Sequence, residues 1–141
     1  MENLYLKAKK IAEEADVSTP KDCLVLYSIS FLPTPKNKED AFDYLSKNSQ
    51  AMMIDQTPCG KQLIELGMLE NSLPQEQIME IWAIASRRLI AKAQGNITAF
   101  VVNADKRSVF RSQELPGLLK NPNVKTINGI DKNIFAAQFN N

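Results

Sequence analysis

Two short, continuous apolar runs constrain the fold of this chain most. They span residues 23–29 (CLVLYSI) and 97–102 (ITAFVV), and polar or turn-forming residues border them. A strand with one face in water alternates apolar and polar residues, whereas a run without alternation is typical of a strand buried on both faces, as in a parallel sheet. Residues 124–130 predict a third strand. We therefore expect a small, mainly parallel sheet.

Apolar residues at helical spacing predict the helices that flank this sheet. The longest helix is predicted at residues 75–93, with Gly95 beyond its end as a stop signal. Other helical segments are predicted at residues 3–16, 38–47 and 61–67. Residues 115–120 are predicted to form a short turn or helix, and residues 134–139 a short terminal element. Residues 51–54 are predicted to be extended, 55–60 to form a turn and 110–114 to form a loop.

The length of 141 residues suits one domain with a sizeable core. We predict the α/β (α+β) class, with a helical N-terminal half packed on the sheet and further helices flanking it. Within the single domain 1–141, residues 1–95 would form a mainly helical lobe whose strand 23–29 joins the sheet. Residues 96–141 would form a strand-rich lobe.

Charge and composition exclude several classes of function. The net charge of +1 provides no basic surface for nucleic acid. No apolar run is long enough to cross a bilayer, and the first residues lack the basic end and apolar core of a secretion signal. The chain has no histidine and two cysteines, so we expect no metal site and no histidine-dependent catalysis. If the chain is an enzyme, carboxylates must carry the chemistry.

Four segments supply candidate site residues. Glu114 is an isolated carboxylate between Phe110 and Leu115-Pro116, and Tyr27-Ser28 ends the first predicted strand, where ligand clefts form in such sheets. Trp82 and Ser86 lie four residues apart, on one face of the long predicted helix. Each also has a structural interpretation: Glu114 as a solvated charge, Trp82 and Tyr27 as core residues, and Asp55 as a turn residue before Thr57-Pro58.

The order of these residues resembles the ADP-ribosyl cyclase and NAD glycohydrolase family. Trp82 and Ser86 match the family's Trp-x-x-x-Ser helix, and Phe110 and Glu114 match its aromatic-Gly-x-x-Glu loop, with Arg111 in place of the glycine. Residues 54–60 (IDQTPCG) resemble its Leu-Glu-Asp-Thr-x-x-Gly segment, with Gln56 replacing the second acid. Tyr27-Ser28 falls where the family has Trp-Ser. The resemblance covers separated blocks between residues 23 and 130.

The resemblance implies a role for each matching residue in one NAD pocket. Glu114, Asp55 and Trp82 would be catalytic: Glu114 stabilises the ribosyl cation, Asp55 orients the nicotinamide amide, and Trp82 holds the nicotinamide ring. The substrate-binding residues would be Tyr27, Ser28, Thr57, Ser86, Arg87, Phe110 and Arg111.

The predicted activity is hydrolysis of NAD or NADP to ADP-ribose and nicotinamide, with the dinucleotide as substrate and no cofactor. An ADP-ribosyl cyclase or ADP-ribosyltransferase using the same pocket is the alternative enzyme. A non-enzymatic α/β interaction module, such as an immunity or adaptor protein, is the alternative from another class.

The chain also resembles the toxin modules of bacterial contact-dependent growth-inhibition systems. The family's secreted animal enzymes have paired cysteines, which are missing here, and the segment Glu2-Asn3-x-Tyr5-Leu6 resembles the junction that marks such toxins. This implies export as the C-terminal part of a larger bacterial protein, action in the target-cell cytoplasm, and a cognate immunity protein as partner.

Overall fold

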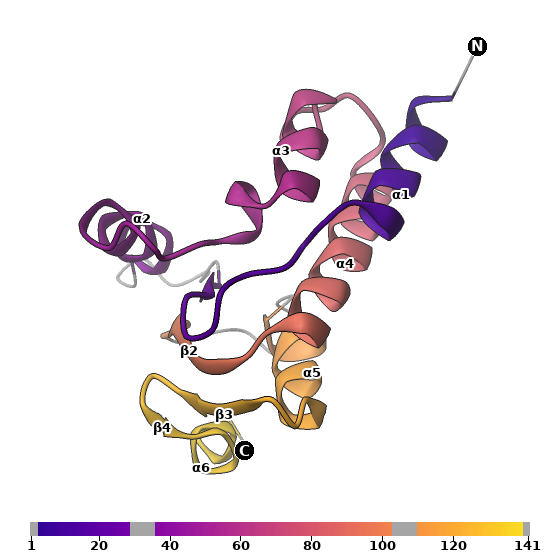
Figure 1. The fold of residues 1–141 in the computed structure, drawn as a ribbon. Helices are drawn as coiled ribbons and strands as arrows, with labels where there is room; N and C mark the ends of the chain where they lie inside the picture. The colour runs from indigo at the N-terminus through magenta and orange to yellow at the C-terminus, as the bar shows by residue number, and fades with distance from the viewer. Residues whose placement is uncertain (1–2, 29–35, 103–109, 140–141) are drawn as a thin grey trace.

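Helices dominate the computed structural model, which describes residues 3–28, 36–102 and 110–139 (Figure 1). The α-helices are α1 (Leu4–Glu14), α2 (Asn37–Lys47), α3 (Pro58–Glu65), α4 (Gln75–Lys92), α5 (Leu115–Lys120) and α6 (Lys132–Ala137). A 3-10 turn, η1 (Ile54–Gln56), precedes α3, and a π-helical turn, η2 (Phe110–Glu114), precedes α5.

The described strands form one four-stranded sheet in the order β1-β2-β3-β4. They are β1 (Val25–Tyr27), β2 (Gly95–Phe100), β3 (Val124–Ile127) and β4 (Ile130–Asp131). The first three are parallel, with Tyr27 opposite Phe100, and β4 returns antiparallel to β3. An isolated bridge joins Leu24 to Met52, within the segment predicted to be extended. The prediction of a small, mainly parallel sheet is confirmed.

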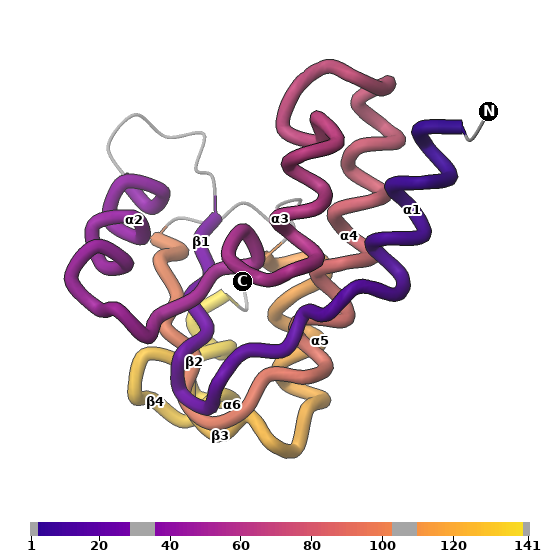
Figure 2. Tube along the Cα trace, turned by 45° about the horizontal axis from the view of Figure 1, so that its top comes forward, coloured from indigo at the N-terminus to yellow at the C-terminus, as the bar shows by residue number. Residues whose placement is uncertain are grey.

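Apolar side chains cover both faces of β1, as its unbroken apolar sequence predicted. Leu24 and Leu26 face the main core beneath α4, whereas Val25 belongs to a smaller cluster with Ala41 of α2 and Met53. Successive strand residues point to opposite faces, so a continuous apolar run serves both layers. Figure 2 shows α2 on one side of β1 and β2, with α1, α3 and α4 on the other.

The long helix α4 contributes a continuous buried face to the main core. Its residues Ile78, Ile81, Ala85 and Leu89 are buried at spacings of three and four, and α1 lies along it. Arg88 reaches across to the end of α1, where its guanidinium donates to two backbone carbonyls, those of Ala12 (2.6 Å) and Ala15 (2.7 Å). These bonds satisfy carbonyls that a helix end leaves without intrahelical partners.

The prediction of one strand at residues 124–130 is wrong, because a hairpin turn divides it. Asn128 and Gly129 have φ values of 54° and 76°, as a tight two-residue turn requires. The Asn128 side chain accepts a hydrogen bond from Ala99 N–H (2.8 Å) and donates to Ala99 C=O (2.9 Å), so it pairs with β2 as a strand residue would. Gly129 N–H donates to Asn96 Oδ1 (2.8 Å).

Two segments predicted as a loop and a turn are helical instead. Residues 110–114 form η2, which runs directly into α5 because Phe110, only 1% exposed, anchors the turn in the core. Helix α3 begins at Pro58 rather than at residue 61, with proline in the first turn and Thr57 as N-cap. Both residue types favour a helix start at these positions.

Candidate active site

The parallel strands β1 and β2 end side by side, and a buried asparagine joins their ends. Ser28, itself buried, donates its N–H to Phe100 C=O (3.1 Å). Asn37, 4% exposed, donates its Nδ2 to Ser28 C=O (3.0 Å) and to Val102 C=O (2.9 Å) and accepts from Val102 N–H (3.1 Å). The first residue of α2 is thereby fixed to the carboxyl edge of the sheet, where ligands bind in open α/β sheets.

Glu114 lies at the end of η2 and is 8% exposed. Within residues 3–28, 36–102 and 110–139, its carboxylate has no hydrogen-bond or ion-pair partner. Burial alone raises its pKa from 4.5 to about 7. An unpaired carboxylate in a place of low polarity attracts a cation strongly, because little water screens its charge.

Two further acidic groups, Tyr27 and Asp55, interact at the end of β1. Burial raises the pKa of the Tyr27 phenol, and the nearby Asp55 and Glu114 carboxylates raise it further. Burial also raises the pKa of Asp55. A hydrogen bond from its own backbone and the charge of Lys38 on α2 lower this pKa, but by less than burial raises it. Tyr27 is therefore within electrostatic reach of both Asp55 and Glu114, and we call these three residues the strand-end site.

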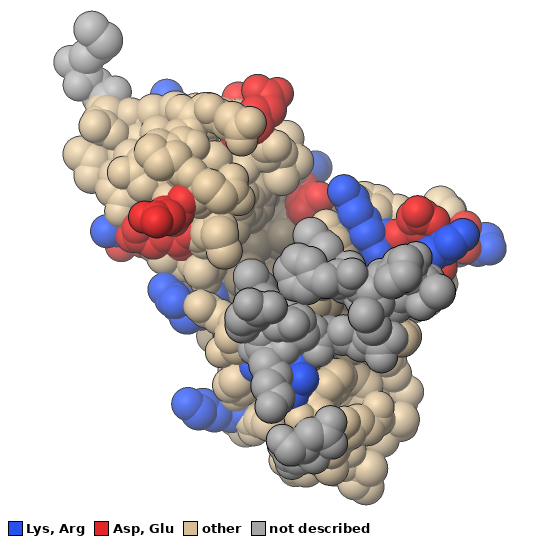
Figure 3. All heavy atoms as spheres, turned by 180° about the vertical axis from the view of Figure 1, so that it is seen from behind, with Lys and Arg blue, Asp and Glu red and all other residues tan. Residues whose placement is uncertain are grey.

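The surface is hollowed close to the elements that carry these groups. Figure 3 shows a recess between the part built by α1, α3 and α4 and the part built by α2, with acidic side chains beside it. The Tyr27 ring packs against Phe42 of α2, with centroids 6.1 Å apart and planes at 52°. Phe42 is 40% exposed, so an aromatic face remains open next to Tyr27.

Trp82 and Ser86 lie on one face of α4, as their spacing predicted. The indole N–H of Trp82 donates to Met68 C=O (2.9 Å), in the turn after α3, and the ring packs in part against the main core. A ligand would therefore meet the ring of Trp82 rather than its N–H. Ser86 is buried, with 7% of its surface exposed.

Thr57 and Phe110 have structural contacts that the sequence did not reveal. The Thr57 hydroxyl is fully buried, donates to Ile54 C=O (2.6 Å) and accepts from Gly60 N–H (3.0 Å). It therefore fixes the turn that carries Asp55. Phe110 packs edge to face with Phe139, at 6.1 Å between ring centroids.

The two arginines predicted to bind substrate, Arg87 and Arg111, make contacts outside the strand-end site. Arg87 is exposed on α4 and donates to Gln113 Oε1 (3.1 Å). The Arg111 guanidinium lies over the Phe139 ring, 4.9 Å from its centroid, and donates to the Phe139 carbonyl.

Of the predicted residues, the structure thus places Tyr27 near both Asp55 and Glu114. It adds Asn37 and Phe42, which the sequence analysis did not select, because nothing local distinguishes them from other residues of a helix start and an apolar helix face.

Two kinds of site are absent from the part of the chain that the structure describes. No group of three or more Cys, Asp or Glu side chains there is placed to hold a metal ion. None of the helices described has the length and apolar character needed to span a bilayer.

Sequence comparison finds no relative: no family model matches the chain, and no curated protein matches it significantly. The structure defines its class, because it has the ADP-ribosyl cyclase-like α/β fold, which confirms the predicted fold class. It is similar to porcine CD38 complexed with a covalent intermediate, ribo-F-ribose-5′-phosphate. That match has a TM-score of 0.59 and 20% identity and covers 96% of this chain and 78% of CD38.

Two cyclase structures are also similar. One is an ADP-ribosyl cyclase complexed with N1-cIDPR, with a TM-score of 0.55 and 19% identity. The other is Aplysia cyclase complexed with substrate NGD and product cGDPR, with a TM-score of 0.54 and 21% identity. Both matches cover 77% of this chain and 48% of the cyclase. The chain thus spans about half the length of the cyclases it matches.

Proposed function

We propose that this chain is an NAD(P)+ glycohydrolase, which converts the dinucleotide and water into ADP-ribose (or its 2′-phosphate), nicotinamide and a proton. The observation that carries the proposal is the buried Glu114 carboxylate, which has no partner in the described residues and lies within electrostatic reach of Tyr27. The similar structures support a nucleotide substrate, since they are complexes with NGD, with cGDPR and with a ribosyl phosphate intermediate.

Glu114 would act on the charge that develops in the reaction. When the bond between ribose C1′ and the pyridinium nitrogen breaks, its electron pair leaves with neutral nicotinamide, and positive charge moves to the ribose. A carboxylate beside the ribose hydroxyls stabilises that charge more in the transition state than in the substrate's ground state, which accelerates the reaction. Water then attacks C1′ and releases the proton.

The other members of the strand-end site would position the leaving group. The Asp55 carboxylate can accept a hydrogen bond from the nicotinamide amide, while Tyr27 and Phe42 offer aromatic faces to its ring. Trp82 supplies a further ring from α4. Gln56, which stands in place of the family's second acid, uses its Oε1 to accept from Met53 N–H (2.6 Å). Because the sequence lacks that acid, we propose hydrolysis rather than cyclisation as the main reaction.

Incubation of the purified chain with NAD and with NADP, followed by chromatography, tests this function. We expect equal amounts of nicotinamide and ADP-ribose, or its 2′-phosphate, from the wild type. Glu114→Gln should lower kcat about 100-fold or more, since it removes a charge from the reacting centre. Glu13→Gln, on the exposed face of α1, is the matched control and should retain full activity.

The products discriminate between the alternatives. Cyclic ADP-ribose would assign the chain as a cyclase, and a modified protein would assign it as a transferase. No consumption of NAD or NADP by a folded chain, with no quenching of Trp82 fluorescence by nicotinamide, would overturn the enzyme proposal in favour of an interaction module.

We further propose that this activity serves as a toxin, delivered as the C-terminal part of a larger exported bacterial protein and acting in the cytoplasm of the target cell. A free NAD glycohydrolase would deplete the dinucleotide pool of its producer, so a cognate immunity protein is the expected partner. Induced expression in a bacterium should lower cellular NAD and arrest growth, and Glu114→Gln should do neither. Growth arrest without loss of NAD would contradict the proposal.

A further inference from the structure

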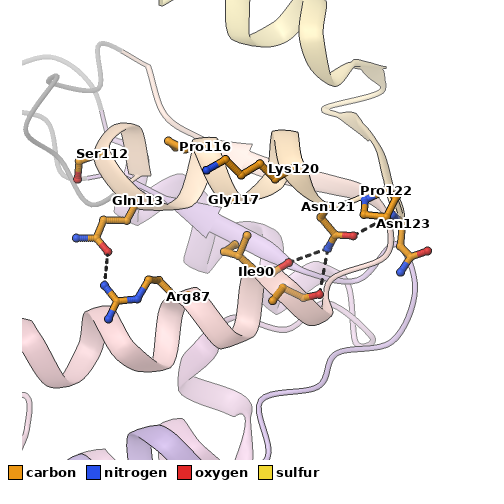
Figure 4. Close-up of a pocket in the computed structure, with 11 residues that line it drawn as sticks. Arg87, Ile90, Ser112, Gln113, Pro116, Gly117, Lys120, Asn121, Pro122 and Asn123 are labelled. Carbon is orange, nitrogen blue, oxygen red and sulfur yellow. Dashed lines mark hydrogen bonds between the residues drawn. The ribbon is translucent and has the colours of Figure 1, made fainter.

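A groove lies between α4 and the segment formed by η2 and α5, apart from the strand-end site (Figure 4). Its volume is about 530 Å³, within the range of small-molecule pockets. Arg87 and Ile90 line it from α4, and Gln113, Gly117 and Lys120 line it from the opposite side. Gln113 lines this groove, while its neighbour Glu114 is buried, so one helical turn contributes to two sites.

The charges around this α4–α5 groove have one sign. Arg87 and Lys120 are both exposed and line it, and no Asp or Glu is among the described residues that do so. Figure 4 shows the Lys120 side chain running back along α5 toward Pro116. Among the residues that the structure describes, the Arg87 guanidinium makes one hydrogen bond, from Nη1 to Gln113, so its other N–H groups can bind a ligand.

Helix ends nearby do not cancel this positive charge. The C-terminal carbonyls of α4 would repel an anion, but Asn121 Nδ2 donates to Ile90 C=O and Ala93 C=O, each at 2.9 Å. At the end of α5, Lys132 Nζ donates to Asn121 C=O (2.8 Å) and Leu118 C=O (3.3 Å). The negative ends of both helices are thus already paired with donors.

We propose that the α4–α5 groove is a second binding site, for a phosphorylated small molecule with a diphosphate group. Arg87 and Lys120 would bind the phosphate oxygens, because their positively charged N–H donors match the charge and acceptors of a diphosphate. The apolar surface of Pro116 and Gly117 would contact the organic part of the ligand. The site is independent of NAD hydrolysis, so its test does not depend on turnover.

Inorganic pyrophosphate is the first probe, titrated by calorimetry at fixed low ionic strength and by NMR of the backbone amides. We expect saturable binding that shifts the amides of Gly117 and Asn123. Arg87→Gln and Lys120→Gln should each weaken binding about tenfold or more, since each removes a charged hydrogen-bond donor. Lys125→Gln removes the same charge from an exposed position on β3 that does not line the groove, and it should leave binding unchanged.

Three outcomes would overturn the proposal. They are no saturation at millimolar pyrophosphate, equal weakening by Lys125→Gln, and amide shifts around Tyr27 and Asp55 instead of the groove. Adenosine diphosphate, titrated in the same way, tests the organic part of the ligand. Tighter binding than pyrophosphate, with the same groove amides shifted, supports contact with the apolar surface, and equal affinity would restrict the site to the diphosphate.

Discussion

Replacement of Glu114 by glutamine should remove activity and make the fold progressively more stable, relative to wild type, as the pH rises. The glutamate pKa is about 7 in the folded protein, because burial disfavours the charged form, against an ordinary value of 4.5. The folded state therefore holds its proton more tightly than the unfolded state. By linkage, this contribution to stability is fully present below about pH 4.5, falls as the pH rises, and is lost above about pH 7.

The interval between the two pKa values sets the size of the effect. At about 1.4 kcal/mol per pH unit, ionisation of the buried carboxyl lowers the free energy of unfolding by about 3 kcal/mol at pH 8. Glutamine has nearly the same shape and no charge to develop. The difference in stability between Glu114→Gln and wild type should therefore grow by about 3 kcal/mol from pH 4.5 to pH 8.

Urea denaturation of both proteins at a series of pH values measures this difference. Burial of glutamine has its own cost, but that cost is the same at every pH. The change with pH in the difference between the two free energies of unfolding therefore reports the ionisation of Glu114 alone. Glu13→Gln is the control, because it removes an exposed carboxylate of α1 and should reproduce the wild-type slope. Parallel curves for Glu114→Gln and wild type would refute the reasoning, since they would mean that the carboxylate is hydrated or paired in the folded state.

Two further predictions concern the strand-end site. In the pH profile, kcat/KM for NAD should fall about tenfold per pH unit below about pH 7 and level off above it, because the ionised form of Glu114 is the active one; a profile flat from pH 5 to 8 would contradict this. Asn37→Ala should lower the free energy of unfolding by about 2–4 kcal/mol, because it removes three hydrogen bonds to the backbone of Ser28 and Val102, one of them buried and two part-buried. Asn48→Ala, which removes one exposed bond to a backbone carbonyl, should cost less than about 1 kcal/mol in the same urea assay.

Features that depend on local spacing could be predicted from the sequence. The unbroken apolar run at residues 23–29 correctly indicated a strand covered on both faces, and the spacing of Ile78, Ala85 and Leu89 correctly indicated the buried face of α4. The hairpin at Asn128 and Gly129 was also predictable, because Asn-Gly is a strong turn signal, but the surrounding apolar residues were interpreted as one strand.

Features that depend on distant contacts could not be predicted. Arg87 and Arg88 are adjacent, yet Arg87 contacts Gln113 and Arg88 reaches carbonyls of α1. The reason is that successive side chains on an α-helix point in directions about 100° apart. Asn37 is 65 residues from Val102, so no pattern near it reveals the bond that joins them. The burial that raises the pKa of Glu114 likewise comes from packing that only the folded chain creates.

The hairpin between β3 and β4 also affects how readily Asn128 loses its amide by deamidation. At Asn-Gly, the glycine nitrogen readily attacks the asparagine amide carbon, because glycine has no side chain to hinder ring closure, and the amide is lost as ammonia. Here both reactants are occupied, since Gly129 N–H donates to Asn96 and the Asn128 amide is bound to Ala99. Ring closure therefore requires this corner of the sheet to open. Water then opens the cyclic imide to an aspartate or isoaspartate carboxylate, which can no longer donate to Ala99, so each opening that leads to ring closure alters the hairpin permanently.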